Sequence, residues 1–377
     1  MPDSQKSPNL YRNPKLGLLS QFGFLILKPW LWIFQKKGTP ASPVTLFQSY
    51  MVGDFFMALP AIKVLAQACN IQVLCRPDCL PFLSAEGIPG LPFENSFFFK
   101  PSLASFSSTF LSAWALRGKL GSIALDFDAD PRSALWLKIG GVRQTVSYTR
   151  PYAYFFNSLF PIPNNILHQA EKNAAVAEGF LTSMRTNDGD LGFAKPIPIR
   201  FPVENFAPIL DPTSGPWILS CFTRRDIKNW SLDQWSILLE RLTAEKFPLL
   251  ILDPPDGDPA FRAFKSHWSK KVGFIAGPLA QIAGYVRSSA GVITTDNFLG
   301  HMAGYFEKPV LWINGSSDSQ LVQPKGPATR CVQVDPMPCR PCRHQCVHVK
   351  YKECLQALHP EEVWKAFGEL RGMVGER

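Results

Sequence analysis

Residues 44–68 read VTLFQSYMVGDFFMALPAIKVLAQA and predict one building block of the fold, a buried strand that leads through a short loop into a helix. Residues 44–48 are an apolar run with a polar end, and residues 55–68 repeat apolar side chains at helical spacing. The loop between them contains Gly53, which lets the backbone turn tightly, and Asp54, which stands at the start of the helix. The segment therefore predicts a βα unit with a polar loop at the carboxyl end of its strand.

The same alternation continues along the chain. Further strands are expected at residues 71–75, 122–127, 145–148, 217–221, 248–252, 291–294 and 309–313. Helices are expected at residues 132–139, 168–180, 232–246, 279–288, 300–306 and 360–371. Residues 186–216, rich in Pro, Gly, Asn and Asp, are a predicted linker between two such series. The pattern indicates an α/β protein with two Rossmann-like, doubly wound domains facing a cleft, and ligands bind such sheets at the carboxyl ends of the strands.

The formal net charge is +9, and residues 1–43 alone hold six Lys or Arg and one acid. Residues 16–34 read LGLLSQFGFLILKPWLWIF, and the Lys28-Pro29 pair inside them disfavours a membrane-spanning helix. A helix on an anionic membrane surface fits this basic, aromatic extension, and a helix packed on the domain or an uncleaved signal-like segment are the alternatives. Because the excess charge lies at the chain ends rather than in a stripe across the body, we expect no nucleic acid partner.

Nine cysteines, an odd number in a large chain, argue against a secreted disulfide scaffold and favour a cytoplasmic protein. Four of them follow the spacing Cys339-x2-Cys342-x3-Cys346-x7-Cys354. Four thiols within so short a segment are typical of a structural zinc site. A redox-labile disulfide pair or plain thiols are the alternatives.

Polar loops follow three of the predicted strands. Asp54 is placed either to cap its helix or to act as a general base on a bound hydroxyl. Residues 222–230 read FTRRDIKNW, and their hydroxyl, guanidinium and ammonium groups suit a pyrophosphate beside a helix N-terminus, or form a solvated basic loop. Residues 294–301 read TTDNFLGH, in which backbone amides and His301 could hold phosphate, or His301 is a buried capping residue.

Together these motifs resemble the glycosyltransferase family 9 proteins, the ADP-heptose:lipopolysaccharide heptosyltransferases, over about residues 44–370. The matches are Gly53-Asp54 with Leu59-Pro60 beyond it, DFDADPRSA at residues 126–134, residues 223–230 with Trp235, residues 296–301 with Lys308-Pro309, and the cysteines ahead of Pro360. The resemblance implies a GT-B architecture, with an acceptor-side domain at residues 44–200 and a nucleotide-sugar-binding domain at residues 201–357. It also implies a last helix, residues 358–377, that crosses back to the first domain.

The resemblance further implies an inverting transfer that needs no metal or cofactor for catalysis. By position, Asp54 matches the general base, and Lys228 would neutralise the diphosphate leaving group. The residues that match donor-binding positions are Thr223, Arg224, Lys228, Asp296, Asn297, Gly300 and His301. The acceptor-side candidates are Gly53, Arg132 and Arg143. The implied partners are a nucleotide-sugar donor, ADP-heptose, and a lipid-linked glycan acceptor such as the lipopolysaccharide core, at the inner face of the bacterial inner membrane.

The chain departs from the family pattern at three places, one of which is Asp253-Pro254-Pro255, where the family has Gly-Gly. Asn297-Phe298 stands where the family commonly has a hydroxyl residue and glycine, and Asp128-Ala129 stands where it has Gln-Gly. These departures leave two alternatives open. One is a non-catalytic, membrane-associated family member that acts as a binding or scaffold protein, and the other is a glycosyltransferase that uses a different nucleotide sugar.

Overall fold

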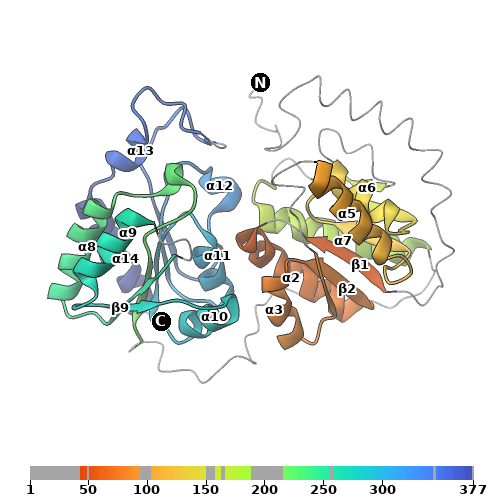
Figure 1. Ribbon diagram of the computed structural model, residues 1–377, viewed down its shortest axis with the longest axis horizontal. Helices are drawn as coiled ribbons and strands as arrows, with labels where there is room; N and C mark the ends of the chain where they lie inside the picture. Colours follow the sequence, from red (N-terminus) through yellow and green to blue (C-terminus); the bar gives the residue numbers. More distant parts are fainter. Residues whose placement is uncertain are drawn as a thin grey trace. The chain divides into compact units, whose positions relative to one another are not determined.

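The computed structural model describes residues 43–48, 51–93, 103–149, 158–162, 166–187, 215–254, 258–342 and 345–375. The chain divides into two units, Met1–Arg200 and Phe201–Arg377 (Figure 1). The predicted surface helix at residues 16–34 and most of the predicted linker at residues 186–216 lie outside the described residues. Among the described helices, none combines the length and the apolar character that crossing a membrane requires.

The first unit contains a sheet of six parallel strands in the order β3-β2-β1-β4-β5-β6. The strands are β1 (Val44–Gln48), β2 (Ile71–Cys75), β3 (Gly90–Pro92), β4 (Ile123–Asp126), β5 (Gln144–Tyr148) and β6 (Ser158–Phe160). The helices are α2 (Val52–Ala68), α3 (Leu80–Ala85), α5 (Leu103–Ala115), α6 (Pro131–Ile139) and α7 (Gln169–Asn187), with the 3-10 turn η1 (Pro77–Cys79). Helix α2 packs against α7, and α5 packs against α6.

The second unit repeats this plan, with six parallel strands in the order β12-β11-β10-β7-β8-β9. The strands are β7 (Trp217–Ser220), β8 (Leu249–Leu252), β9 (Gly273–Ile275), β10 (Gly291–Thr295), β11 (Val310–Ile313) and β12 (Thr329–Val332). The helices are α8 (Leu232–Ala244), α9 (Pro259–Trp268), α10 (Leu279–Arg287), α11 (Phe298–Tyr305), α12 (Ser319–Val322), α13 (Glu353–Gln356) and α14 (Pro360–Gly375), with the 3-10 turn η3 (Asp226–Lys228).

Each sheet has a point at which the direction of the crossovers reverses. In the first unit the chain moves outward from β1 to β3 and then restarts at β4, on the other side of β1. In the second unit it moves from β7 to β9 and restarts at β10, beside β7. Loops leaving two such neighbouring strands diverge and leave an open crevice at their carboxyl ends, where ligands of doubly wound sheets bind. The fold thus directs attention to the loops after β1 and β4 and after β7 and β10.

Aromatic side chains fill both cores. Phe93 contacts both Phe47 and Trp136 in the first unit, with ring centroids 4.9 and 4.8 Å apart. In the second unit Trp230 and Trp235 are fully buried, and their rings lie 5.3 Å apart. These side chains bury large apolar surfaces and so hold the layers of helix and sheet together.

The crossing of the last helix back to the first domain stays a prediction, and the structure shows how this helix packs within its own unit. Helix α14 packs on α8, β11 and β12 of its own unit. Its buried side chains Val363, Phe367 and Leu370 belong to the second core, and Phe367 contacts Trp217 at 4.8 Å. Burial of this apolar face explains why the helix stays on the second sheet.

Candidate functional site

The loop after β7 is closed upon itself and presents Lys228 at its end. Asn229 closes it, because its Oδ1 accepts a hydrogen bond from the Thr223 backbone N–H at 2.7 Å and its Nδ2 donates to the Thr223 carbonyl at 2.9 Å. The Thr223 hydroxyl donates to the Arg225 carbonyl at 2.9 Å and accepts from the Arg225 N–H at 3.1 Å. Arg224 is exposed on this loop. Ser231 caps the following helix through the Gln234 N–H at 3.2 Å, as predicted.

Asp296, the first residue after β10, is the buried centre of the site. Its Oδ2 lies 2.5 Å from the Lys228 Nζ, and it also accepts a hydrogen bond from the Ser317 hydroxyl. Burial alone would raise the pKa of Asp296, but Lys228, Ser317 and nearby His301 outweigh burial and hold the pKa below its ordinary value. The structure therefore brings together Lys228, Asp296 and His301 from the predicted set.

Asn297 has a structural role that explains why it replaces a hydroxyl residue. Its Oδ1 caps α11 by accepting from the Leu299 N–H at 2.9 Å, and it also accepts from the Thr294 hydroxyl at 3.0 Å. Its Nδ2 donates to the Ser220 hydroxyl at 2.8 Å, which ties the end of β10 to the end of β7. The Asn297 amide, which we predicted to bind the donor, thus forms hydrogen bonds with groups of the protein itself. Asparagine can replace a hydroxyl residue here because it caps helices as well as serine does.

Gly300 has a packing role in α11. It is buried in α11, and a Cβ atom at this position would stand 2.9 Å from Cγ of Pro324. The position therefore requires a residue without a side chain for packing alone, and donor binding by Gly300 stays a prediction.

Sequence reasoning missed the contribution of the loop after β11. Ser317 reaches Asp296 from this loop, and the neighbouring Ser316 hydroxyl is buried with no hydrogen-bond partner. Residues 314–317 read NGSS directly after a predicted strand, the same signal of polar residues at a carboxyl end that marked the other loops. The carboxyl edge of β7, β10 and β11 thus presents an ammonium group, hydroxyls and a helix N-terminus, which is chemistry suited to an anionic phosphate.

In the first unit, Asp54 lies where the prediction placed it, in the first turn of α2 after the buried Gly53. Its Oδ2 accepts a hydrogen bond from the Met51 backbone N–H at 3.1 Å. The capping interpretation is therefore confirmed. A carboxylate has about four acceptor positions, and the cap uses one of them. The Asp54 carboxylate can therefore cap the helix and still accept a proton.

Asp126, at the end of β4, organises the next loop from a fully buried position. Its Oδ1 accepts from the backbone N–H groups of Asp128 and Ala129 at 2.7 and 3.0 Å, and the Ser133 hydroxyl donates to its Oδ2. Burial and the neighbouring Asp128 raise the pKa of Asp126 well above its ordinary value. The turn forces Ala129 to a φ of +50°, a conformation that glycine adopts without strain.

The two arginines predicted for an anionic acceptor lie in different surroundings. Arg132 is already engaged by Asp130, with Nε 2.9 Å from Oδ1 and an Nη 2.5 Å from Oδ2, and both side chains are largely buried. Arg143 is exposed and directly precedes β5, so it lies at the amino edge of a parallel sheet. It is therefore at the opposite edge from Asp54 and Asp126, because the strands all run in one direction.

The four clustered cysteines remain free thiols near one another. Burial, followed by the neighbouring thiols of Cys339 and Cys346, raises the pKa of Cys342 to about 11. Burial also raises the pKa of Cys354. Within the described ranges, no group of three or more Cys, His, Asp or Glu side chains is arranged to hold a metal ion. The zinc site therefore stays a prediction.

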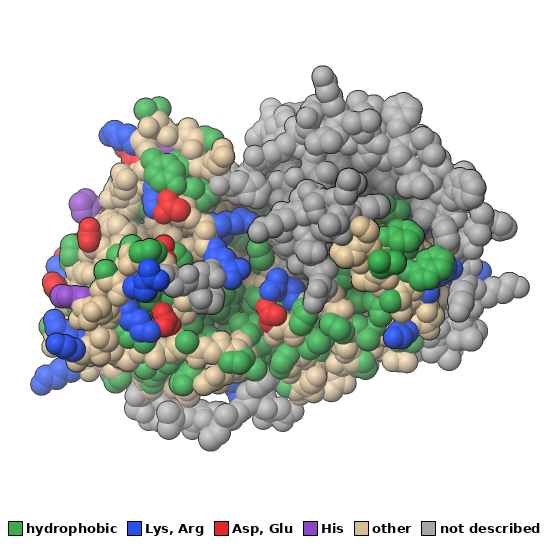
Figure 2. Space-filling view, viewed as in Figure 1, with side chains coloured by type: hydrophobic (Ala, Val, Ile, Leu, Met, Phe, Trp, Pro, Cys, Tyr) green, Lys and Arg blue, Asp and Glu red, His purple; other side chains and the backbone are tan. Residues whose placement is uncertain are grey.

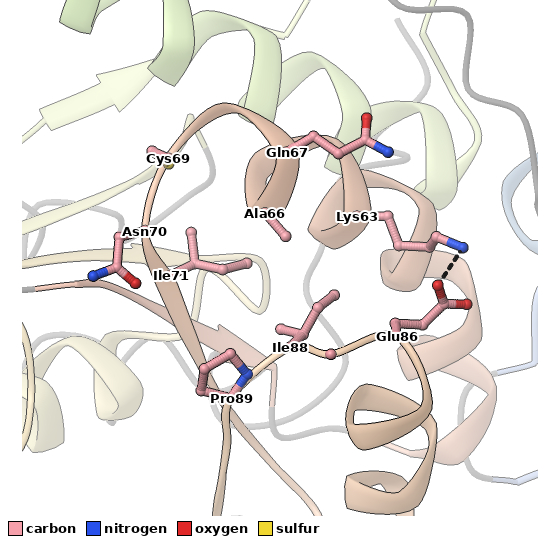
Figure 3. A pocket seen from close by; sticks show the side chains of 10 residues that line it. Lys63, Ala66, Gln67, Cys69, Asn70, Ile71, Glu86, Ile88 and Pro89 are labelled. Carbon is pink, nitrogen blue, oxygen red and sulfur yellow. Dashed lines mark ion pairs between the residues drawn. The ribbon is translucent and has the colours of Figure 1, made fainter. Parts of the chain in front are cut away.

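A pocket of about 390 Å³ lies elsewhere in the first unit (Figure 3). It is lined by the end of α2 and by residues that precede β2 and β3, which places it at the amino edge of the sheet. Lys63 and Glu86 form an ion pair of 2.7 Å at its rim. None of the predicted site residues lines this pocket, so it is separate from the candidate site.

The visible face of the second unit shows no single basic stripe. In Figure 2 its lysine and arginine side chains stand at several separate places and are interspersed with acidic ones. On this face, no broad positive field is visible that would attract an anion.

No known family model matches the chain, and no curated protein sequence matches it either. Solved structures do match. The chain is similar to E. coli ADP-heptose lipopolysaccharide heptosyltransferase II, at 16% identity and a TM-score of 0.65, over 89% of this chain and 99% of that one. It is similar to E. coli heptosyltransferase WaaC with ADP, at 16% identity and a TM-score of 0.65, over 87% and 99% of the two chains.

A third similar structure is the glycosyltransferase family 9 protein from Veillonella parvula, at 12% identity and a TM-score of 0.68, over 89% of this chain and 98% of that one. At such identities the likeness shows the fold. It confirms the expected GT-B fold class, with two Rossmann-like domains, over nearly the whole chain.

We expect Asp296→Asn to lower the free energy of unfolding by about 2–4 kcal/mol at neutral pH, because it leaves the Lys228 ammonium without its buried counter-ion. The folded-state pKa of Asp296 is depressed, so its ionised form stabilises the fold above about pH 4 and this contribution is lost as pH falls through the folded pKa. Urea unfolding between pH 7 and pH 3 measures the free energies of unfolding of the wild type and of Asp296→Asn. The difference between the two should become smaller as the pH falls.

The matched control is Asp233→Asn, which changes an exposed carboxylate in the first turn of α8. It should shift stability by less than about 0.5 kcal/mol at every pH. Equal effects of the two substitutions at neutral pH would contradict the central role of Asp296.

Proposed function

We propose that this protein is an inverting glycosyltransferase that transfers a heptose or a similar sugar from a nucleotide diphosphate, ADP-heptose, to a lipid-linked glycan acceptor such as the lipopolysaccharide core. The observation that carries the proposal is the Lys228–Asp296 pair at the crossover reversal of the second sheet. A buried carboxylate there holds an ammonium group at the edge where doubly wound sheets bind phosphate-bearing ligands. Solved structures with the same fold include a heptosyltransferase with ADP, which supports this class of donor.

The donor diphosphate is proposed to bind the loop after β7 and the N-terminus of α11. Lys228 is 21% exposed at its side chain, so this side chain is partly accessible while Asp296 anchors its ammonium group. As the bond between the anomeric carbon and the diphosphate breaks, negative charge grows on the leaving group. A preorganised cation stabilises that charge more in the transition state than in the bound donor, and this difference lowers the barrier.

Asp54 is proposed to be the general base. An acceptor hydroxyl attacks the anomeric carbon from the face opposite the diphosphate, so the configuration inverts, and its proton passes to the Asp54 carboxylate. The hydrogen bond from Met51 fixes this side chain at the first turn of α2. The proposed reaction uses no catalytic metal, since Lys228 supplies the positive charge.

A non-catalytic binding protein is the second candidate function. Two observations favour it: the Asn297 amide is consumed by the helix cap, and the half-buried Phe298 occupies the first position of α11. Both leave less free surface at this N-terminus than a glycine would.

A glycosyltransferase with another nucleotide sugar keeps the same mechanism and differs only in the donor.

Calorimetry with ADP, UDP, GDP and ADP-heptose tests the donor site first. We expect adenine compounds to bind preferentially, and Lys228→Ala to weaken binding by about 10- to 100-fold, the value of a charge-assisted hydrogen bond. The control Lys270→Ala removes an exposed lysine that precedes β9, at the amino edge, and should leave binding unchanged. Preference for another base would identify a different donor, and no binding by any nucleotide would reject the transferase.

Asp54→Asn tests the base separately from the donor site. Asparagine keeps an oxygen that can accept the Met51 hydrogen bond, so the helix cap survives. We expect transfer to fall about 10²- to 10⁴-fold while donor affinity stays the same, because only proton transfer is lost. Undiminished turnover would remove Asp54 from the mechanism.

We further propose that the protein works at the inner face of the bacterial inner membrane. The basic, aromatic residues 16–34 support this location, since a lipid-linked acceptor is held at that surface. Deletion of residues 1–40 should abolish cosedimentation with anionic vesicles, and added salt should weaken binding of the intact chain. Equal sedimentation of both forms would contradict the proposal.

The cysteine spacing supports a structural metal, for which Cys339, Cys342, Cys346 and Cys354 are the proposed ligands. Four thiolates favour zinc or iron. Metal analysis of the purified protein should find one equivalent, lost in Cys342→Ser, whereas Cys69→Ser, a partly buried thiol of the first unit, should retain it. A metal-free wild type that resists unfolding equally with and without chelator would exclude the metal.

A further inference from the structure

The segment of residues 339–354, here called the cysteine segment, contacts both loops that hold Asp296. One contact is with the loop after β7. The Tyr351 hydroxyl donates to Asp226 Oδ2 at 2.6 Å, and the Lys352 ammonium lies 2.8 Å from Asp226 Oδ1. The same ammonium donates to the backbone carbonyls of Asp226 at 3.2 Å and Asn229 at 3.4 Å. These four hydrogen bonds therefore hold both ends of η3, the turn that contains Lys228.

The second contact is with the loop after β11, which supplies Ser317. The Cys342 backbone N–H donates to the Ser316 carbonyl at 2.7 Å, and Arg340 Nε donates to the Gly315 carbonyl at 2.9 Å. Leu355, just beyond the segment, packs so closely on Gly315 that a Cβ there would lie 2.5 Å from the leucine Cγ. Both partners of the buried carboxylate are thus supported by one segment more than a hundred residues away from Lys228.

Within the cysteine segment, a thiol fixes the residue that makes most of these bonds. The Lys352 backbone N–H donates to Cys346 Sγ at 3.3 Å, and Lys352 has a φ of +55°, which is unusual for a side chain-bearing residue. The Lys352 carbonyl in turn accepts from the Leu355 and Gln356 N–H groups at 2.9 Å. The backbone of Lys352 is therefore locked on both sides, and its ammonium is directed toward η3.

We infer that Tyr351 and Lys352 are positioning residues of the donor site, which hold η3 so that the Lys228 ammonium stands ready for the donor diphosphate. The inference rests on the proposed function. The ligand class is a nucleoside diphosphate, and the two residues act on it through Lys228 rather than by contact.

The exposure of Asp226 distinguishes a role in positioning the loop from a role in stabilising the fold. The Asp226 side chain is 62% exposed, and ion pairs of exposed groups add little to stability because water screens them. All four bonds end on Asp226 or on the Asn229 carbonyl, at the two ends of one short turn. Such a network restrains a loop more than it stabilises a fold, so its loss should appear in ligand affinity.

The test compares Lys352→Met with Lys350→Met by calorimetry with ADP or whichever nucleoside diphosphate binds the wild type. Lys350 lies two residues away, is 75% exposed at its side chain and pairs with Glu353 rather than with Asp226. We expect Lys352→Met to weaken binding about three- to tenfold and Lys350→Met to leave it unchanged, with thermal unfolding alike in both. Lys352→Arg should restore most of the affinity, and Tyr351→Phe should show a smaller loss.

A double variant distinguishes positioning from general damage. If Lys352 acts through Lys228, then Lys228→Ala with Lys352→Met should bind no more weakly than Lys228→Ala alone, whereas independent effects would multiply. Multiplied effects, or an unchanged affinity in Lys352→Met beside a clear loss in Lys228→Ala, would overturn the inference and leave the proposed function standing. A wild type that binds no nucleotide would overturn the proposed function and the inference with it.

Discussion

The carboxylate of Asp296 must stay ionised in a buried place, and the carboxyl edge of the second sheet is arranged to meet that requirement. Removal of a charge from water costs several kcal/mol unless partners replace the lost hydration. Here the partners come from separate segments, with Lys228 after β7 and Ser317 after β11. Since neither loop is regular structure, their conformations depend on this shared anchor and on the cysteine segment packed outside them.

The two units place carboxylates at corresponding points of the fold but use them in opposite ways. Asp126 ends the fourth strand of the first sheet beside another carboxylate, Asp128, which helps to raise its pKa. Asp296 follows the fourth strand of the second sheet beside an ammonium group, and its pKa is lowered. The first edge thus holds two buried carboxyl groups, and the second holds a fixed cation, which suits an anionic ligand. This difference supports the proposal that a donor diphosphate binds the second unit.

The residues where the chain departs from the family pattern are explained by local structure. Asn297 replaces a hydroxyl residue yet still caps α11, and it links two strand ends besides. Ala129 occupies a position with positive φ, where glycine is the ordinary choice, because Asp126 collects the backbone N–H groups of that turn. Both residues thus have a structural role within this chain.

The amino-acid sequence by itself determined the alternation of strands and helices and its division into two linked series. It also determined which strands are followed by polar loops. These features could be predicted because apolar periodicity and capping are local properties. It placed Asp54, Lys228 and Asp296 at carboxyl ends correctly. It did not place Arg143, which lies at the amino edge, or show that α14 remains on its own sheet. Only the tertiary structure decided strand order, the meeting of Asp296 with Ser317, and the support of η3 by Lys352. These depend on contacts between segments far apart in the chain, and local pattern carries no information about such contacts.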